Sequence, residues 1–285
     1  MSEPLSMTDP RQRWAEARLE LAVSLHPAGH PDGEARVWRV DDRNGHARAY
    51  LKQHRVPDKW HRERTILVRL REPPAAAVPE LLASDGDELL LLLGVCAGGP
   101  ATSSSLTASD ERALHEQAGR FRRRLDEVAS DGDDDPLPLP EALTRRLHAW
   151  LGRARSSLAP ALRQRVAAAF DPRPFEGATR RWCHRDLAPH NWIVQPSEHG
   201  PRLSVIDFGQ ARPDAWLVDV LKLWDDAWAR DPALAEAFFA GYGRTLDATE
   251  HAQLRQLALL HGLATATWGD HHAHARFSAH GRAVL

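Results

Sequence analysis

The chain has 285 residues, which is enough for one substantial core or for two lobes and more than a small binding module needs. Its 37 lysine and arginine residues nearly balance 39 aspartate and glutamate residues, so composition gives no nucleic-acid footprint and no acidic tail. The two cysteines, Cys96 and Cys183, lie far apart without CxxC spacing, which argues against a disulfide framework and a cysteine zinc site. The N-terminus lacks the apolar core of a signal peptide, and the run at Leu89–Leu93 is far shorter than the roughly 20 residues that cross a bilayer. We expect a cytoplasmic protein with neither nucleic acid nor membrane as a partner, and its oligomeric state leaves no pattern in the sequence.

Strand signals dominate residues 1–97. A turn at Asp42–Gly45 predicts a hairpin, and Lys59–Leu70 has its apolar residues at helical spacing before a double proline. We expect an antiparallel five-stranded sheet plus one helix. The predicted strands are Leu19–Leu25, Arg36–Val40, Arg48–Gln53, Val78–Ala83 and Glu88–Val95.

The chain changes to helical periodicity after the Gly98–Pro100 break. An acidic loop at Asp131–Asp135 interrupts this helical part, and residues 271–280 form a histidine-bearing tail. The sequence thus predicts two lobes, 1–97 and 98–285, the second rich in helix. The predicted helices are Thr107–Val128, Pro140–Leu151, Ala159–Phe170 and most of Asp214–Thr267.

One segment of the helical part breaks its pattern, because short strand-like runs alternate there with polar residues. The stretch from His184 to Asn191 reads HRDLAPHN, and the apolar run SVI is followed by DFG at 207–209. The pair resembles the H-x-D-x-x-x-x-N catalytic loop and the D-F-G metal-binding motif of the kinase superfamily, and the surrounding sequence is similar to the aminoglycoside phosphotransferase and choline kinase branch. This resemblance spans most of the chain. It implies an α+β, bilobal protein kinase-like fold with a nucleotide-binding lobe at 1–97 and a catalytic, substrate-binding lobe at 98–285.

The resemblance also implies roles for five residues. Asp186 occupies the motif position of the family's catalytic base. Asn191 and Asp207 occupy the positions of its Mg²⁺ ligands, which bind the ion through side-chain oxygens. Lys52 matches the lysine that holds the phosphates of ATP or GTP, and Glu63 is placed to pair with it. The competing interpretations are a turn aspartate at 207 and an ordinary surface pair of Lys52 with Glu63. No chemistry is assigned to Cys183, His184, Arg185 or His190.

Some details differ from the family of protein kinases. Lys59 competes with Lys52 for the phosphate role, although the strand position favours Lys52. The turn between His26 and Glu34 contains only Gly29 and Gly33 in place of G-x-G-x-x-G. Asp219 looks like a structural aspartate and follows the metal motif too closely for an activation segment, so proteins are not expected as acceptors.

The acceptor is expected to be a small hydroxylated molecule, with an aminoglycoside-like antibiotic, an amino alcohol and a sugar all open. Asp214, Asp225, Asp226 and the acidic loop would suit a cationic acceptor, although solvated helix faces explain them equally well. Three tryptophans at helical spacing are better explained as core than as a binding surface. They are Trp216, Trp224 and Trp228.

The predicted function is Mg²⁺-dependent transfer of the γ-phosphate of ATP or GTP to a hydroxyl of that small molecule. One alternative is a non-catalytic kinase-like module that binds nucleotide or a partner. The other is a metal-binding protein that uses the histidines between Asp270 and His274.

Overall fold

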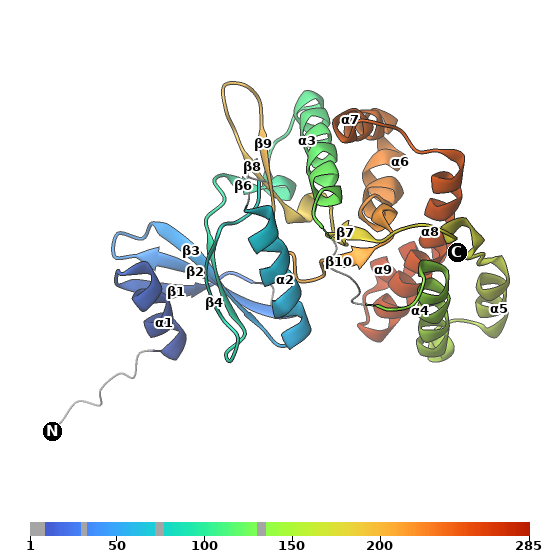
Figure 1. Cartoon of the computed structure of the whole chain (residues 1–285), viewed down its shortest axis with the longest axis horizontal. Coiled ribbons are helices and arrows are strands. Elements are labelled where there is room, and N and C mark those ends of the chain that lie inside the picture. The colour runs from blue at the N-terminus through green and yellow to red at the C-terminus, as the bar shows by residue number, and fades with distance from the viewer. Residues whose placement is uncertain (1–8, 30–32, 72–76, 130–134) are drawn as a thin grey trace. The chain divides into compact units, whose positions relative to one another are not determined.

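The computed structural model describes residues 9–29, 33–71, 77–129 and 135–285, and the chain divides into two compact units (Figure 1). Unit 1 comprises residues 1–107 and 189–211, and unit 2 comprises residues 108–188 and 212–285. The segment 189–211, which the sequence assigned to the C-terminal lobe, therefore clusters with the N-terminal sheet. The boundary between residues 97 and 98 stays a prediction about domains.

Unit 1 is built on an antiparallel five-stranded sheet in the order β1-β2-β3-β5-β4, which confirms the predicted sheet. The predicted hairpin turn is present, since the Gly45 amide donates to the Asp42 carbonyl at 3.0 Å. The first strand starts later than predicted, because residues 19–22 do not extend it. The strands are β1 (Val23–Pro27), β2 (Ala35–Asp42), β3 (Ala47–His54), β4 (Leu81–Asp85) and β5 (Leu90–Gly94).

Both faces of this sheet are covered. Ala49 and Leu51 of β3 are fully buried in a cluster with Ala15 of a helix that was not predicted, α1 (Pro10–Leu19). Lys52 of β3 reaches the predicted helix α2 (Pro57–Leu70). Because successive strand residues point to opposite faces, α1 and α2 cover opposite sides of the sheet. This double cover explains why β5 has four consecutive buried leucines.

A second, three-stranded sheet in unit 1 holds the segments around the two motifs. It pairs β6 (Gly99–Pro100), β8 (Trp192–Gln195) and β9 (Arg202–Val205) in the order β6-β8-β9. One further backbone bond extends it, because the Ile206 amide donates to the Asn191 carbonyl at 2.9 Å. Asn191 and Asp207 are therefore brought close along adjacent chain segments.

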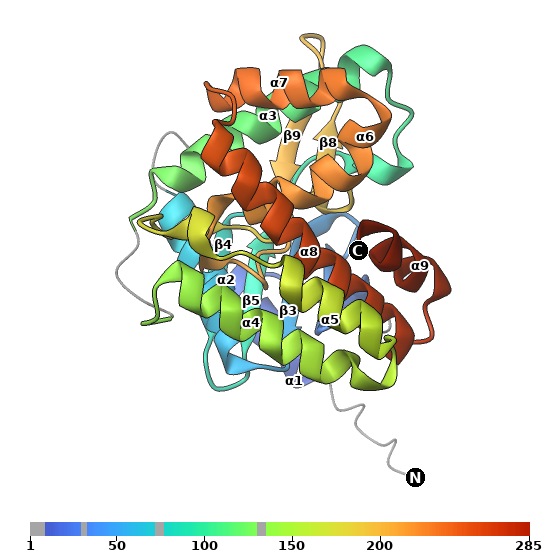
Figure 2. The same ribbon diagram turned by 90° about the vertical axis from the view of Figure 1, so that its right-hand side faces the viewer.

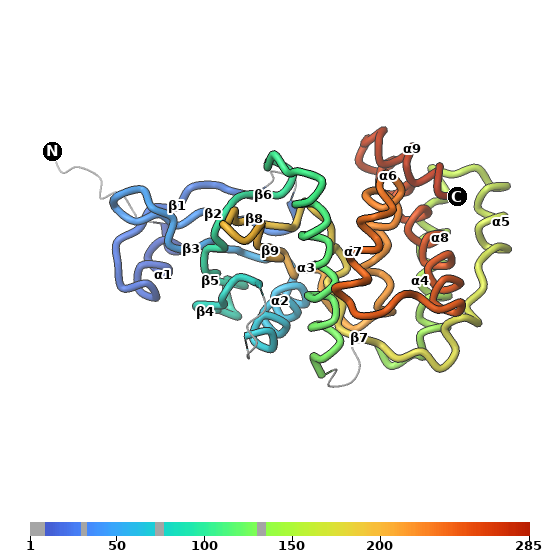
Figure 3. Tube along the Cα trace, turned by 90° about the horizontal axis from the view of Figure 1, so that it is seen from above, coloured from blue at the N-terminus to red at the C-terminus, as the bar shows by residue number. Residues whose placement is uncertain are grey.

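Unit 2 is helical apart from a two-stranded ribbon of β7 (Arg181–Cys183) and β10 (Arg212–Asp214). Figure 3 shows α3 and α7 side by side, and Figure 2 shows α9 beside the C-terminal half of α8. The predicted helices of this part are confirmed with small changes at their ends. The helices are α3 (Ala108–Asp126), α4 (Leu139–Arg153), α5 (Pro160–Ala169), α6 (Trp228–Arg230), α7 (Pro232–Tyr242), α8 (Ala248–His271) and α9 (Ala275–Val284).

Three features of unit 2 differ from the prediction. Asp214 ends a strand instead of starting a helix, since it pairs with Arg181 across the ribbon. The following segment forms a 3-10 turn at Trp216–Asp219 and a π-helix at Leu223–Ala227. The histidine-bearing tail contains α9, which was not predicted. Across the described ranges, no helix is both long and apolar enough to span a membrane. Most of the acidic loop, residues 131–134, lies outside the described residues.

Candidate active site

A chain of ion pairs joins three of the sequence-predicted residues in unit 1. The Lys52 Nζ atom lies 2.7 Å from Glu63 Oε2 and 2.7 Å from Asp207 Oδ1. Lys52 and Glu63 are buried, whereas the Asp207 side chain keeps 56% of its surface exposed. The alternative of an ordinary surface pair is therefore wrong for Lys52 and Glu63. One cation is held between a buried carboxylate and a carboxylate that solvent can reach.

The charges in this cluster favour their ionised forms. Burial alone would lower the pKa of Lys52, but Glu63 and Asp207 outweigh it and raise that pKa above its usual value. Burial would raise the pKa of Glu63, and Lys52 with the His54 hydrogen bond lowers it instead. His54 Nε2 lies 2.8 Å from Glu63 Oε2, and the Phe208 amide donates to Glu63 Oε1 at 3.3 Å. Glu63 thus links α2 and β3 to the DFG segment. No local sequence pattern predicted that His54 would contact Glu63.

Asp207 adopts an unusual backbone conformation for an aspartate. Its φ of 65° lies in the left-handed region, which costs a non-glycine residue free energy and is common where a side chain is aimed for function. The strand β9 ends two residues earlier, so this turn redirects the Asp207 carboxylate as the strand stops. Asn191 is buried, and its amide side chain belongs to the same unit. The two residues offer oxygen donors of the kind that Mg²⁺ prefers, and the exposure of Asp207 lets a hydrated ion reach it, so the donor set fits that ion.

Lys59, the competing lysine, has a different environment. It pairs with Glu34, whose side chain is 64% exposed, and Gln210 donates to the same carboxylate at 2.6 Å. Lys59 therefore belongs to a surface network with Glu34 and Gln210. The turn that precedes Glu34 contains residues 30–32, so part of the predicted phosphate-covering loop lies outside the described residues.

Asp186 lies in unit 2, where its carboxylate is partly buried and forms an ion pair with Lys222. Its backbone amide donates to Nδ1 of His184 at 3.3 Å. His184 therefore helps to shape the loop through this contact. Lys222 was not predicted, because it lies 36 positions from Asp186 and no local pattern connects them.

The backbone before Asp186 is held by Asp219. This buried carboxylate accepts hydrogen bonds from the amides of His184 at 3.0 Å and Arg185 at 2.6 Å. Its own charge is balanced by Arg122, whose Nη1 donates to Asp219 at 2.8 Å and to the Trp182 carbonyl at 2.6 Å. The structural role predicted for Asp219 matches these contacts. Arg122, fully buried on α3, was missed because its partner is 97 positions away.

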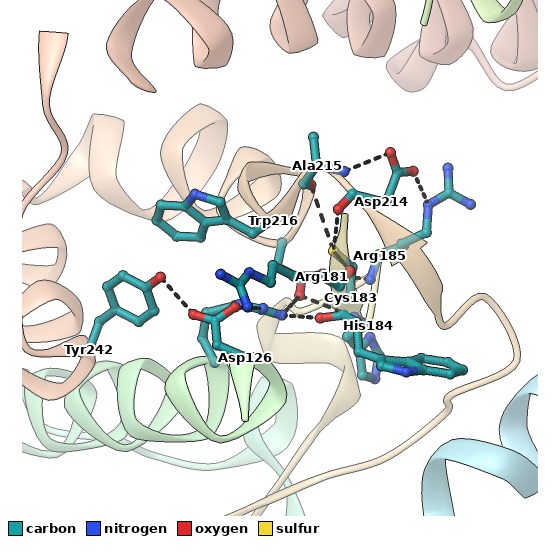
Figure 4. Close-up of polar contacts among 12 residues, drawn as sticks. Asp126, Arg181, Cys183, His184, Arg185, Asp214, Ala215, Trp216 and Tyr242 are labelled. Carbon is teal, nitrogen blue, oxygen red and sulfur yellow. Dashed lines mark hydrogen bonds and ion pairs between the residues drawn. The ribbon is translucent and has the colours of Figure 1, made fainter. Parts of the chain in front are cut away.

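Further polar contacts surround the backbone of His184 and Arg185 (Figure 4). Arg122 also pairs with Asp126, which accepts from the Tyr242 hydroxyl at 2.7 Å. Arg185 has a φ of 65° and its Nε lies 3.1 Å from Asp214 Oδ2. The backbone of His184 and Arg185 is therefore restrained by ion pairs that reach α3 and β10, and the Tyr242 hydrogen bond extends this network to α7.

The acidic residues considered for a cationic acceptor are mostly engaged within the protein. Asp214 is buried between Arg146 and Arg185, which corrects its reading as an acceptor contact. Asp226 is 70% exposed beside Arg230, and Asp225 contacts His280. The described end of the acidic loop, Asp135, pairs with Arg145.

The tryptophans divide between core and surface. Trp228 is buried against two phenylalanines, so the core interpretation holds for it. Trp216 is half-buried and stacks on Tyr242 at 4.8 Å. Trp224 is exposed and borders a cavity on unit 2.

Comparison with solved structures shows the same fold at low sequence identity. The complex of gentamicin with the aminoglycoside phosphotransferase APH(2")-IIa has a TM-score of 0.71 and 14% identity, covering 100% of this chain and 96% of that one. The macrolide 2'-phosphotransferase MphH from Brachybacterium faecium has a TM-score of 0.66 and 20% identity, covering 98% of both chains. An ethanolamine kinase from Plasmodium vivax has a TM-score of 0.62 and 14% identity, covering 98% of this chain and 83% of that one. No curated protein matches the sequence.

The fold and the paired motifs define a kinase-like phosphotransferase with a helix-rich second unit. A model of the phosphotransferase enzyme family matches residues 28–257, and the chain belongs to this family. The predicted fold class, the family and the enzyme class are confirmed.

Proposed function

We propose that this phosphotransferase transfers the γ-phosphate of ATP or GTP to a hydroxyl of a small amino-bearing molecule. The observation that carries the proposal is the ion-pair chain of Glu63, Lys52 and Asp207. A buried ammonium held by one buried carboxylate and one exposed carboxylate can bind phosphate oxygens without losing its charge. Two similar aminoglycoside phosphotransferases, solved as a GDP and kanamycin complex and as a streptomycin and ATP complex, support the same donor and acceptor classes.

In this proposal Lys52 binds the nucleotide phosphates and Glu63 holds Lys52 in position. Asn191 and Asp207 would hold Mg²⁺, which supplies positive charge to the phosphates during transfer. The left-handed turn at Asp207 presents its carboxylate toward solvent, where a hydrated ion and a nucleotide arrive together.

Asp186 acts as the catalytic base. Its carboxylate orients the acceptor hydroxyl and accepts the hydroxyl proton as the new bond to phosphorus forms. Lys222 keeps the Asp186 carboxylate oriented through its ion pair. Asp219 restrains the backbone of the two residues before Asp186 by accepting hydrogen bonds from their amides. These contacts leave the base little freedom to turn away.

The acceptor is a small hydroxylated molecule, with an aminoglycoside-like antibiotic or an amino alcohol as the first choices. Only 12 positions separate Asp207 from Asp219, and Asp219 is committed to the catalytic-loop amides. No long segment remains there to display a peptide.

The test is Mg²⁺-dependent transfer from ATP or GTP to a panel of aminoglycosides, macrolides, amino alcohols and sugars, read by mass spectrometry. We expect a phosphorylated product from the native chain and a loss of about 100-fold to 10,000-fold in Asp186→Asn, since general base catalysis contributes about that much. Asp226→Asn is the matched control, because this exposed aspartate has no role in the proposal. A native protein that modifies no member of the panel and does not bind nucleotide with Mg²⁺ would overturn the proposal in favour of the non-catalytic alternative.

A further inference from the structure

Three side chains from three separate elements of unit 2 converge on one point. Asp225 comes from the π-helix, His261 from α8 and His280 from α9. The Asp225 Oδ2 atom lies 2.5 Å from Nε2 of His280 and 4.0 Å from Nε2 of His261, and all three donor atoms fall within 4.8 Å of one another. Throughout the described ranges this is the one group of three or more metal-ligating side chains.

Two imidazoles and one carboxylate form a ligand set typical of zinc and its neighbours in the first transition row. Ligands bound at about 2.0–2.2 Å in a tetrahedron lie roughly 3.4 Å apart. The two measured distances lie on either side of that value. Small side-chain rotations would therefore bring the three donors onto one ion.

The backbone already holds these ligands near their positions. A side chain on Gly281 would place its Cβ 2.2 Å from the Ala266 amide nitrogen. Because glycine has no side chain, α9 can approach α8 closely, which brings His280 near His261. The π-helix carries an extra residue in its turn, a feature that is frequent at functional sites, and Asp225 lies in it. Helix packing, not chance surface proximity, thus sets the cluster.

His261 is also suited to donate a lone pair. An imidazole nitrogen binds a metal through its lone pair, and the His261 side chain keeps 21% of its surface exposed. Lys222 is the nearby cation. Lys222 itself is paired with Asp186, which offsets its repulsion of a cation.

An adjoining cavity gives the site an open side. It has a volume of about 520 Å³ and is lined in part by Asp225, His280, Trp224 and Arg255. Three protein ligands leave the fourth position of a tetrahedral ion for water or another small ligand. The cavity provides room for that ligand.

We propose that Asp225, His261 and His280 bind one divalent transition-metal ion of the zinc type, with its fourth position open to this cavity. The site is separate from the Mg²⁺ ligands of the proposed function and does not depend on them. It also differs from the metal site that the sequence suggested for the histidines between Asp270 and His274. His272 stacks on Trp268 at 4.3 Å and His274 lies edge-on to Phe277 at 4.5 Å, so these rings contact aromatic side chains, and neither belongs to the three-ligand group.

The experiment is a Co²⁺ titration of the full, tag-free chain, read by visible d–d absorption and followed by displacement with Zn²⁺. We expect one equivalent of Co²⁺ with four-coordinate absorption. His280→Gln changes an exposed ligand, and we expect it to weaken binding at least tenfold. The matched control, His272→Gln combined with His274→Gln, is expected to bind as the native chain does.

The proposal is overturned if no saturable equivalent of Co²⁺ binds, or if the control loses binding while His280→Gln retains it. Circular dichroism checks that each variant is folded. Asp225→Asn supplies a second variant should His280→Gln lose its fold, and a folded Asp225→Asn chain with unchanged Co²⁺ affinity would likewise overturn the proposal.

Discussion

The side chain of Lys222 is the unexpected partner of the proposed base. We expect Lys222→Met to lower kcat by about 10-fold to 100-fold, because a misdirected catalytic group costs rate on that order. The KM for nucleotide should change little, since Lys222 contacts the proposed base Asp186, and Lys52 is the residue proposed to hold the phosphates. Lys222→Arg, which keeps the charge, should recover most of the rate. Equal activity in the native chain and Lys222→Met would remove Lys222 from the mechanism.

Asp214 is expected to give the fold an acid-sensitive component. Burial alone would raise its pKa, but Arg146 and Arg185 lower it below its usual 3.8. A carboxyl whose pKa is lower in the folded chain contributes stability above the unfolded-state pKa, and this stability is lost as the pH falls below about 4. Asp214→Asn leaves two partly exposed cations, Arg146 and Arg185, without their buried carboxylate, so we expect a loss of about 1–3 kcal/mol in the free energy of unfolding at pH 7.

Urea denaturation between pH 7 and pH 2.5 measures this difference. The gap between native chain and Asp214→Asn should shrink below about pH 4 as the native carboxyl takes up a proton. Asp226→Asn, which changes an exposed carboxylate, should stay within about 0.5 kcal/mol of the native chain throughout. A gap that stays constant with pH would contradict the assignment.

At the scale of elements, α3 and α7 pack so closely that their backbones touch. A Cβ atom on Gly241 would lie 1.9 Å from the Glu116 carbonyl oxygen, so even alanine there forces the helices apart. We expect Gly241→Ala to destabilise the chain by about 1–3 kcal/mol, the range for overpacking. Gly152 of α4 meets nothing within 4 Å, and Gly152→Ala should stabilise the chain by up to about 1 kcal/mol. Thermal unfolding of the two variants compares them directly, and similar shifts in both would contradict the close packing.

The elements that the sequence predicted and those it missed differ in physical ways. The strand that carries Lys52 and the helix α2 were predicted because their apolar spacing is regular. Helix α1 was missed because Leu19, Leu21 and Val23 alternate like a strand, although Asp9 as the N-cap and Pro10 after it marked the helix start. Helix α9 consists mostly of small and polar residues, and its packing against α8 through Gly281 has no local signal.

The residues of the candidate site also divide into those that the sequence predicted and those that it missed. Asp186, Asn191 and Asp207 carry a motif that is readable along the chain, and the spacing to Asp219 was readable as well. Lys222 and Arg122 act through partners many positions away, so only the folded chain connects them. Asp214 was misassigned because exposure is not visible in a sequence.

For the whole molecule, nucleotide and Mg²⁺ together should raise stability by mass action. At 100 times the dissociation constant a ligand adds about 2.7 kcal/mol to the free energy of unfolding. We expect a thermal shift with ATP or GTP plus Mg²⁺ in the native chain and in Asp186→Asn, and its loss in Lys52→Met. Lys59→Met should keep the shift, because Lys59 pairs with exposed Glu34 outside the ion-pair chain. A shift that depends on Lys59 and not on Lys52 would reverse the assignment of the two lysines.

The left-handed backbone of Asp207 also bears on how the gene can lose its activity. Asparagine and glycine are the residues that tolerate this conformation best, and each is a single base change from an aspartate codon. Spontaneous mutation at this codon therefore readily produces chains that keep the turn while losing the carboxylate. Null alleles of this kind would accumulate folded protein instead of being cleared by proteolysis.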